Sequence, residues 1–345
     1  MRVMVVDPGV AFSPADVSNG WCRGLKAQGC EVFAFNLGDR LNFYTQAELE
    51  RNGERRKALN NEAAFRLALN SLYAEHYLFW PDITLIVSSF FVPNEVLDRL
   101  SSRGHAIVVH LTESPYEDDQ QLGRAAHADL LLLNDPTNID EFLKFNPQTF
   151  YQPHCYDPRV HFRGPGLPEI ASDFAFVGTG YPSRAEFFEA ALKLGAFDEL
   201  KILLAGHWAS LDEGSPLRDF VSHPIENCID NTDTADVYRS TRASANLYRR
   251  ESNAEHLSDG WAMGPREVEL AACGTFFITE ARGENAEVLP FVPTFSGPED
   301  FSEQLRYWLD REEQRDEITR RATAALADRT FDNAAAKLLQ RVESL

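Results

Sequence analysis

The stretch PREVELAACG at residues 265–274, followed by the apolar run TFFIT at 275–279, indicates how the second half of this chain folds. The pattern of 265–273 suits a short helix that ends at Gly274, because glycine readily adopts the left-handed conformation that closes many helices. The apolar run behind it is typical of a buried strand. A helix that leads directly into a buried strand is the repeating unit of an α/β sheet.

The same alternation extends over the whole chain. Strands are expected at 3–6, 31–35, 83–87, 107–109, 130–133, 173–177, 201–204, 245–248 and 276–279, and helices at 17–28, 46–77, 94–103, 183–194, 234–240 and 265–273. Short, continuously apolar strands suit a parallel sheet that is covered on both faces. The sequence therefore predicts an α/β protein with two doubly wound Rossmann-like domains.

The domain limits follow from a cluster of prolines and glycines at 164–168, which neither a helix nor a central strand accepts. We expect an N-terminal, acceptor-side domain at 1–156, a linker at 157–170 and a C-terminal, ligand-binding domain at 171–315. The charged tail at 316–345 is expected to be helical and to cross back to the first domain.

Composition limits the partners and the compartment. Lys and Arg number 33 against 53 Asp and Glu, a net charge of −20 that repels polyanions and disfavours nucleic acid as a partner. The cysteines are odd in number and lack C-x-x-C spacing, so reduced thiols in the cytoplasm are expected. The N-terminus has no signal-peptide layout, and the apolar runs are shorter than the ~20 residues of a membrane span.

A candidate anion site lies in FVGTGYPSR at 176–184, which follows a strand and opens a helix. The backbone at Gly178, Thr179 and Gly180 can approach a ligand closely, and helix N-termini favour phosphates. Ser183 and Glu186 have the spacing of a capping box, and the planar fork of Arg184 matches phosphate oxygens. A plain tight turn with a surface arginine is the simpler alternative, because a single G-x-G is a weak motif.

A candidate hydroxyl-binding carboxylate is Glu269, one turn before the end of the expected helix. A carboxylate accepts hydrogen bonds from two hydroxyls, as a ribose presents them. Glu267 is a competing candidate, but residues two apart on a helix do not share a face, so at most one of them points to a ligand. Arg266 gains nothing from the dipole at the helix start, which suggests an anionic contact or a plain surface arginine.

Paired arginines end the strand expected at 245–248. At the carboxyl end of a strand, Arg249 and Arg250 are placed to neutralise a departing diphosphate, or simply to meet solvent. The polar loop at 251–264 is long, and long loops tend to be functional. It carries Asn253, His256, Asp259 and Trp261.

The first half offers candidates for acid–base chemistry. His110 and Glu113 follow a strand, and either is a possible general base for a hydroxyl, although a histidine after an apolar run is often structural. The loop Asp7, Pro8 and Gly9 ends the first strand and is expected to touch an acceptor. The stretch HCYDP at 154–158 has no second pair of ligands nearby, so it is interpreted as a hinge, and no metal site is expected.

Together these stretches resemble the spore-maturation (CgeB-like) family of GT-B glycosyltransferases. The matching pieces are HCYDPRVH at 154–161, DFAFVGTGYPSRAEFFEA at 173–190, LLAGHW at 203–208, ANLYRRES at 245–252 and GPREVELAACGTFFITE at 264–280. They cover roughly residues 150–310. The first domain matches only loosely, mainly at HLTESPYED (110–118).

The resemblance implies a GT-B fold with two domains facing a cleft, a nucleoside-diphosphate sugar as donor, and no cofactor or metal. Glu269 would hold the ribose. The rest of the donor-binding set would be Gly178, Thr179, Gly180, Arg184, Gly206, Trp208, Arg249 and Arg266. Arg249 would also be catalytic, together with His110 or Glu113 as base. The transferred sugar would be a hexose or a pentose, and the acceptor a small molecule, a glycan, a protein or a modified nucleic acid.

One departure from the family pattern keeps alternatives open. Many retaining GT-B enzymes carry a glutamate eight residues before the position of Glu269, where this chain has Trp261. A displaced carboxylate such as Asp259, a nucleotide- or sugar-binding protein without turnover, and a GT-B-fold epimerase or phosphorylase are therefore alternatives. The sequence does not choose between a retaining and an inverting outcome.

Overall fold

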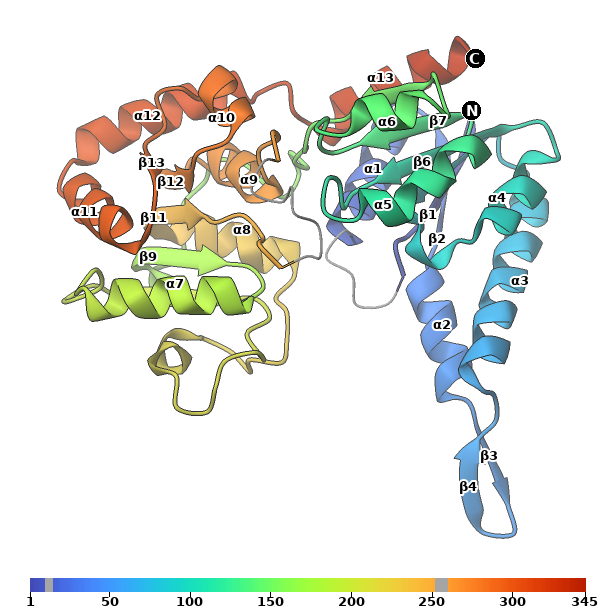
Figure 1. Ribbon diagram of the computed structural model, residues 1–345, viewed down its shortest axis with the longest axis horizontal. Coiled ribbons are helices and arrows are strands. Elements are labelled where there is room, and N and C mark those ends of the chain that lie inside the picture. Colours follow the sequence, from blue (N-terminus) through green and yellow to red (C-terminus); the bar gives the residue numbers. More distant parts are fainter. Residues whose placement is uncertain (10–14, 252–259) are drawn as a thin grey trace. The chain divides into compact units, whose positions relative to one another are not determined.

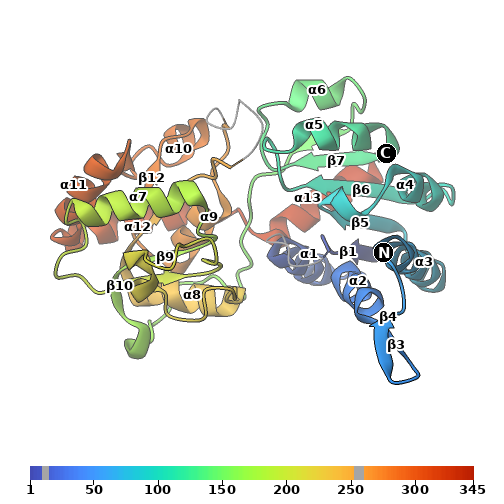
Figure 2. The ribbon, with the colours of Figure 1, turned by 60° about the horizontal axis from the view of Figure 1, so that its bottom comes forward.

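The computed structural model describes residues 1–9, 15–251 and 260–345. The chain packs as two compact units (Figures 1 and 2): unit 1 comprises Met1–Pro153 and Phe331–Leu345, and unit 2 comprises His154–Thr330. The limits expected from sequence differ from these bounds most at the C-terminus. There α12 (Glu312–Ala325) packs on unit 2, and only α13 (Phe331–Glu343) packs on unit 1.

Unit 1 is built around a parallel sheet with the strand order β2-β1-β5-β6-β7-β8 among the described residues. Its strands and helices are β1 (Arg2–Val6), α1 (Ala15–Ala27), β2 (Glu31–Phe35), α2 (Leu37–Gln46), β3 (Glu48–Arg51), β4 (Glu54–Lys57), α3 (Asn61–Phe79), β5 (Ile83–Val87), α4 (Asn94–Ser101), β6 (Ala106–Leu111), α5 (Asp118–Gln121), β7 (Leu130–Leu133), α6 (Ile139–Leu143), β8 (Thr149–Tyr151) and α13, with 3₁₀ turns η1 (Ser89–Phe91) and η2 (Leu122–His127).

The core of unit 1 lies on both faces of this sheet, as the apolar strands require. Met4, Ile86 and Val109 pack against α2, α3 and α4 on one face. On the other face, Trp21 of α1 contacts His110 of β6 edge to face. Helix α13 packs along α1, where Phe331 lies 5.8 Å from the Trp21 ring between centroids.

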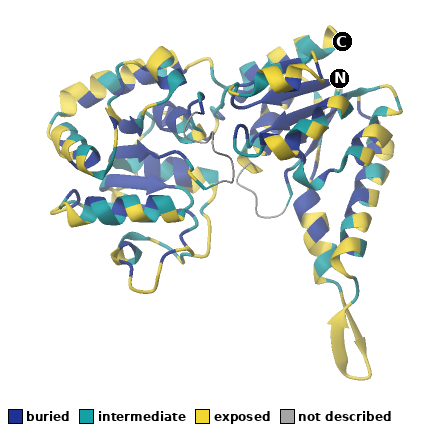
Figure 3. Cartoon of the chain, in the orientation of Figure 1, coloured by how far each residue is buried: buried dark blue, intermediate teal, exposed yellow. Residues whose placement is uncertain are grey.

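A β-hairpin interrupts the helix that was expected at 46–77, so the first part of that prediction is wrong. Strands β3 and β4 pair antiparallel around Asn52 and Gly53, both of which have positive φ. An Asn-Gly pair in this conformation is the strongest short-range hairpin signal. The hairpin is exposed throughout (Figure 3), and the helix resumes at α3, where the Asn60 side chain caps the N-terminus.

Unit 2 has a parallel sheet with the order β10-β9-β11-β12-β13 among its described residues. Its elements are η3 (Pro168–Ile170), β9 (Ser172–Val177), α7 (Pro182–Lys193), β10 (Ile202–Ala205), η4 (Pro216–Phe220), α8 (Asn231–Ser240), β11 (Thr241–Asn246), α9 (Pro265–Cys273), β12 (Phe277–Glu280), α10 (Gly283–Val288), β13 (Thr294–Phe295), α11 (Pro298–Leu309) and α12. The helix and strand expected from PREVELAACGTFFIT are thus present as α9 and β12. Gly274 adopts the left-handed conformation at the end of α9.

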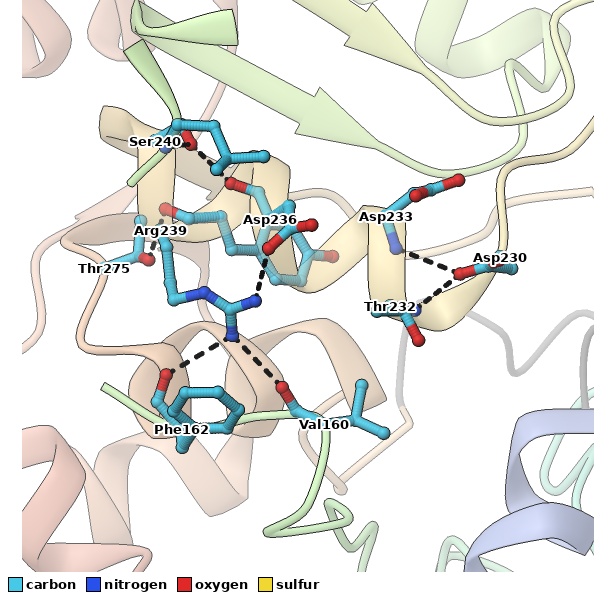
Figure 4. A network of polar contacts seen from close by, with 11 residues as sticks. Val160, Phe162, Asp230, Thr232, Asp233, Asp236, Arg239, Ser240 and Thr275 are labelled. Atoms are coloured by element: carbon cyan, nitrogen blue, oxygen red, sulfur yellow. Dashed lines mark hydrogen bonds and ion pairs between the residues drawn. The ribbon is translucent and has the colours of Figure 1, made fainter. Parts of the chain in front are cut away.

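The segment expected as a linker is anchored to unit 2. Arg239 of α8 donates to the carbonyl oxygen of Val160 (3.1 Å) and pairs with Asp236 (2.5 Å), as Figure 4 shows. The guanidinium of Arg239 also stacks on the Phe162 ring, 4.6 Å from its centroid. Because these contacts fix the backbone, residues 160–162 behave as part of unit 2 and not as a loose connection.

A histidine pair, with His76 buried and His105 half-buried, lies at the amino-terminal edge of the unit 1 sheet. The Nε2 atoms of His76 and His105 are 3.0 Å apart, and Thr84 Oγ1 is 3.0 Å from His105 Nε2. Burial, followed by the nearby charges of His105 and Arg103, lowers the pKa of His76 from 6.5 to about 4. Burial and Arg103 likewise lower the pKa of His105 to about 4.

We expect this pair to make stability pH-dependent. Between pH 6.5 and pH 4 the unfolded chain binds more protons than the folded chain, so the free energy of unfolding falls as the pH falls through this window. The loss for His76 alone is on the order of 1–2 kcal/mol between pH 7 and pH 5. Urea unfolding at both pH values checks this, and His76→Gln should flatten the pH dependence. An equally steep dependence in that variant would contradict the assignment.

Candidate functional site

The candidate site lies at the carboxyl edge of the unit 2 sheet. The chain leaves β9 towards β10 on one side and returns to β11 on the other, so the strand order reverses between β9 and β11. In doubly wound sheets ligands bind outside the strand ends at such a reversal. The segments that follow β9 and β11 meet the start of α9 at this edge.

Arg266 joins the ends of the two strands. Its Nε donates to the Val177 carbonyl (2.8 Å), and its Nη1 donates to Asn246 Oδ1 (2.7 Å). The guanidinium also lies 4.3 Å from the centroid of the Phe176 ring. Arg266 is therefore held in place by the sheet, and its positive charge is fixed at the edge where the strands separate.

Arg184 makes a second cross-link at the same edge. This buried side chain donates from Nη1 to the Thr179 carbonyl (3.0 Å) and from Nη2 to the Leu247 carbonyl (2.7 Å). Both terminal nitrogens thus serve backbone carbonyls on the two sides of the reversal. In this arrangement Arg184 contributes its charge to the site and not the bidentate contact expected from sequence.

Three of the expected donor-binding glycines are explained by packing. The Gly178 N–H donates to the Ala205 carbonyl (3.0 Å), and the Gly180 N–H donates to the His207 carbonyl (2.8 Å). The Gly206 N–H donates to Nε2 of His223 (3.0 Å). These amides are engaged within the protein, so they do not form a phosphate cradle. In this turn, the described residues supply no acceptor for the Thr179 amide.

Trp208 corrects another expectation. Its side chain is fully buried, and its Nε1 donates to the Ala205 carbonyl (2.9 Å). A Cβ added at Gly180 would clash with the indole ring, so the absence of a side chain at Gly180 makes room for Trp208. Trp208 is a core residue that supports the turn and does not present a surface to a donor.

The N-terminus of α7 already holds an anion. The helix begins at Pro182 after Tyr181, without a side-chain cap, so the predicted capping box of Ser183 and Glu186 is wrong. Instead Glu251 Oε1 accepts from the Ser183 N–H (2.8 Å). Burial raises the pKa of Glu251. Hydrogen bonds from Ser183 and from the backbone together lower this pKa by more than burial raises it, so the net shift is downward. A carboxylate is the chemistry that a helix N-terminus favours.

The two glutamates of α9 differ sharply in environment. Glu267 is fully buried and accepts from the Tyr248 hydroxyl (2.8 Å), the Thr279 hydroxyl (2.9 Å), the Gly264 N–H (2.7 Å) and the Asn285 amide. Burial raises its pKa despite these bonds. Glu269 is only partly buried. Its charge adds to burial in raising the pKa of the neighbouring Tyr238 well above the usual range. Glu269 is therefore the α9 carboxylate that a ligand can reach.

The two arginines that follow β11, Arg249 and Arg250, contact different elements. Arg250 pairs with Glu280 Oε1 of β12 (2.5 Å), and Glu280 Oε2 accepts from the Tyr248 N–H (2.7 Å). Arg249 donates from Nε to the Glu251 carbonyl (2.8 Å), and its guanidinium lies 5.4 Å from the Tyr181 ring centroid. The pair therefore ties the segment after β11 to β12 and to the start of α7.

The long loop of the candidate site falls partly outside the described residues. Asn253, His256 and Asp259 lie there, whereas Trp261 is described. The end of the loop is held by α10: the Met263 N–H donates to Glu284 Oε2 (2.6 Å), and Glu284 N–H donates to the Trp261 carbonyl (2.9 Å). The position eight residues before Glu269 is thus fixed by hydrogen bonds although it carries an indole.

Unit 1 places the expected acid–base residues on β6 and in the loop that follows it. The Trp21 Nε1–H donates to His110 Nδ1 (3.0 Å), so the neutral imidazole carries its proton on Nε2. His110 is then set to donate from Nε2, and a general-base role would break the bond to Trp21. Glu113 is partly buried, and Ser114 anchors its loop by donating to Asp118 (2.6 Å) and Asn134 (3.0 Å).

The acceptor-side loop is largely structural. Asp7 Oδ1 accepts from the N–H groups of Gly9 (3.1 Å), Leu37 (2.9 Å) and Gly38 (3.3 Å), which caps the start of α2. Burial raises the pKa of Asp7, and these bonds oppose the rise. Pro8 is buried beside it. An acceptor contact at Asp7, Pro8 and Gly9 stays a prediction.

The part of the chain that the structure describes contains no group of three or more His, Cys, Asp or Glu residues that could hold a metal ion. Within the same residues, no helix has the length and apolar character needed to cross a membrane.

Comparison with known proteins identifies what the chain resembles. A family model described as glycosyl transferase-like matches residues 184–340. The spore protein CgeB of Bacillus subtilis (strain 168) is 23% identical over 279 residues, covering 75% of this chain and 82% of that protein. The predicted resemblance to CgeB-like GT-B glycosyltransferases is confirmed.

Solved structures show the fold of this CgeB-like chain. Sucrose-phosphate synthase from Thermosynechococcus elongatus superposes with a TM-score of 0.65 at 14% identity, covering 100% of this chain and 98% of that one. The trehalose-6-phosphate synthase OtsA gives 0.67 at 13% identity, with coverages of 100% and 99%. The alpha-glucosyltransferase AGT, in complex with UDP, gives 0.66 at 12% identity, with both chains covered fully. The fold has the two Rossmann-like domains of GT-B.

Residues of the candidate site that sequence reasoning missed include Glu251 and Glu280. Glu251 directly follows the arginine pair, and an acidic residue next to two arginines at a strand end was the available signal. Glu280 closes the matched stretch that contains α9 and β12, but nothing in its sequence neighbourhood pointed to Arg250.

The contrast within α9 predicts opposite responses to mutation. Glu267→Ala should lower the free energy of unfolding by roughly 3 kcal/mol or more, because it leaves buried donors such as the Tyr248 hydroxyl without an acceptor. Glu269→Ala should cost less than about 1 kcal/mol. Urea unfolding of both variants measures the difference, and similar losses would refute the structural role assigned to Glu267.

Proposed function

We propose that this chain transfers a glycosyl group from a nucleoside-diphosphate sugar to an acceptor hydroxyl. The observation that supports this most is that Glu269 of α9 is partly exposed, whereas Glu267 on the same helix is fully buried. Both residues lie inside the stretch that matches the glycosyl transferase-like family model. In the proposal Glu269 holds the ribose of the donor, since a carboxylate accepts from two hydroxyls.

The donor diphosphate would lie at the β9–β11 reversal. Arg184 and Arg266 are locked there by backbone and side-chain acceptors, so their charges are preorganised and need no rearrangement when negative charge develops. Arg249 is the proposed catalytic contact to the departing diphosphate, and the Thr179 amide is a candidate donor to a phosphate oxygen. Glu251 stands at the start of α7, so we propose that phosphates bind beside this helix end and not on it.

The acceptor would bind unit 1, where Glu113 is the preferred candidate for the base. Glu113 is partly exposed, in a loop fixed by Asp118 and Asn134. His110 is less suited to act as the base, because it is buried and its Nδ1 already accepts from Trp21. A base is needed only if the reaction inverts, because in a retaining reaction the departing phosphate takes the proton.

A binding protein without turnover is the second candidate, and one observation favours it. Trp261 stands where many retaining GT-B enzymes carry a sugar-contacting glutamate, and hydrogen bonds through α10 fix that position. Donor hydrolysis in the absence of acceptor separates the two candidates, because a pure binder leaves the donor intact.

We expect Glu269→Ala to weaken nucleotide binding by at least about 1 kcal/mol, the scale of a lost hydrogen bond to a charged group. Calorimetry with UDP-, GDP-, ADP- and TDP-linked hexoses and pentoses identifies the donor and measures the loss. Glu313→Ala, which removes an exposed glutamate of α12, is the matched control. Equal affinity in the Glu269→Ala and control proteins would sink the ribose assignment.

We also propose that arginine, and not a metal, neutralises the leaving group. Donor hydrolysis by the wild type should then persist in EDTA. Arg249→Ala should lower turnover more than donor affinity, because the leaving-group charge grows in the transition state. The control is Arg320→Ala, an exposed arginine of the same unit. Activity that EDTA abolishes and Mg²⁺ restores would contradict the proposal, as would equal losses in turnover and affinity.

A further inference from the structure

A cavity of about 350 Å³ opens on unit 1 at the carboxyl end of β2. Its walls come from the edge strand β2, from the first turns of α2 and from Glu75 of α3. Figures 1 and 2 both show α2 and α3 running side by side from this end of the sheet. The volume lies within the range of about 300–1,000 Å³ that is usual for small-molecule sites.

The cavity offers an aromatic ring to a ligand. Phe43 of α2 lines it and is 67% exposed. Single exposed apolar residues are common and need no explanation. Phe43, however, lines a concave site together with Phe33, whose ring packs on Phe79 (5.3 Å between centroids), so the exposed Phe43 ring can cover an apolar face of a bound molecule.

Planar polar groups stand next to that ring. Arg40 Nη2 is 3.9 Å from Glu75 Oε1, beyond normal hydrogen-bond distance, so Arg40 keeps donors for a ligand. Asp39 and Asn36 share a hydrogen bond (2.8 Å) and keep further acceptor positions. A wholly apolar ligand would bury these groups without partners, which is costly.

The edge strand adds backbone groups. The Glu31 N–H donates to the Met1 carbonyl and the Phe35 carbonyl accepts from the Asp7 N–H, so the odd-numbered residues of β2 bond towards β1. Alternate residues of a strand bond to opposite sides, and among the described residues β2 stands at the edge of the sheet. The N–H and C=O of Ala34, which also lines the cavity, therefore point away from β1, towards the open edge of the sheet.

The net charge of the cavity disfavours anionic ligands. Two carboxylates, Asp39 and Glu75, face one guanidinium, Arg40, so a phosphate or another polyanion would meet net negative charge. A neutral molecule with apolar C–H faces and many hydroxyls matches the rings, the planar groups and the strand edge together. That combination describes a saccharide.

We propose that this cavity is a saccharide subsite of unit 1 that holds part of a glycan acceptor. Its place in the reaction rests on the proposed glycosyl transfer, whereas the binding itself does not. The acceptor would then be an oligosaccharide or a glycan-bearing molecule, with one sugar ring stacked on Phe43 and its hydroxyls shared among Arg40, Glu75 and the edge of β2.

The test is saturation-transfer NMR and calorimetry on the full chain with chitotriose, cellotriose and maltotriose. At least one trisaccharide should bind the wild type, and Phe43→Ala should weaken that binding roughly fivefold or more. Phe43→Tyr, which keeps the ring, should retain it. Leu78→Ala is the matched control, because Leu78 is a 78% exposed residue of α3 that does not line the cavity.

Two outcomes would overturn the subsite: no binding of any of the three trisaccharides, or equal binding in wild type and Phe43→Ala. Nucleotide binding by the same variants is measured in parallel and should not change. A chain that binds a trisaccharide through Phe43 but no nucleotide would refute the proposed glycosyl transfer and leave the subsite standing, so the two failures are distinguishable.

Discussion

The candidate site depends on the hydrogen bonds that arginine side chains make across the reversal of the unit 2 sheet. Two parallel strands that send the chain to opposite sides leave their last carbonyls without strand partners at this edge. Arg266 satisfies the carbonyl of Val177 and reaches Asn246, and Arg184 satisfies Thr179 and Leu247. The same bonds that complete the backbone also fix two positive charges where an anionic ligand would bind. The same contacts therefore hold the backbone and fix the positive charges, so the charges need no rearrangement when a ligand binds, as a preorganised site requires.

Sequence reasoning predicted what local pattern controls. The strands β5, β7 and β9 could be predicted because their sequences are continuous apolar runs. The end of α9 could be predicted because Gly274 readily adopts the left-handed conformation that closes a helix. It failed where a residue type has more than one physical use. The glycines at 178 and 180 suggested a phosphate cradle, but the structure uses them for close packing: Gly178 makes room for Arg266, and Gly180 for Trp208. The helix expected at 46–77 was wrong in its first part, because the charged residues there suit a helix and the Asn52-Gly53 turn between β3 and β4 was overlooked.

The carboxylates show why a site cannot be derived from sequence alone. Glu267 and Glu269 are two residues apart and chemically identical, yet one is a buried acceptor for the core and the other reaches the surface. Helical spacing predicts that they face different directions, but which direction leads to solvent depends on Tyr248, Thr279 and Asn285 from other elements. Likewise, Glu251 reaches the start of α7 by accepting a hydrogen bond from Ser183, a residue far from it in the sequence.

The return of the chain to unit 1 has a consequence for how the protein is made. Unit 2 is one continuous segment, whereas unit 1 needs segments on both sides of unit 2, since Phe331 of α13 packs on Trp21 of α1. Domains fold as units while the ribosome is still extending the chain. Unit 2 can therefore complete its core as soon as Thr330 has emerged, but unit 1, although it begins earlier in the chain, must wait for residues 331–345. Until then the α1 face that receives α13 stays uncovered, and a chain released early would carry a finished unit 2 beside an incomplete unit 1.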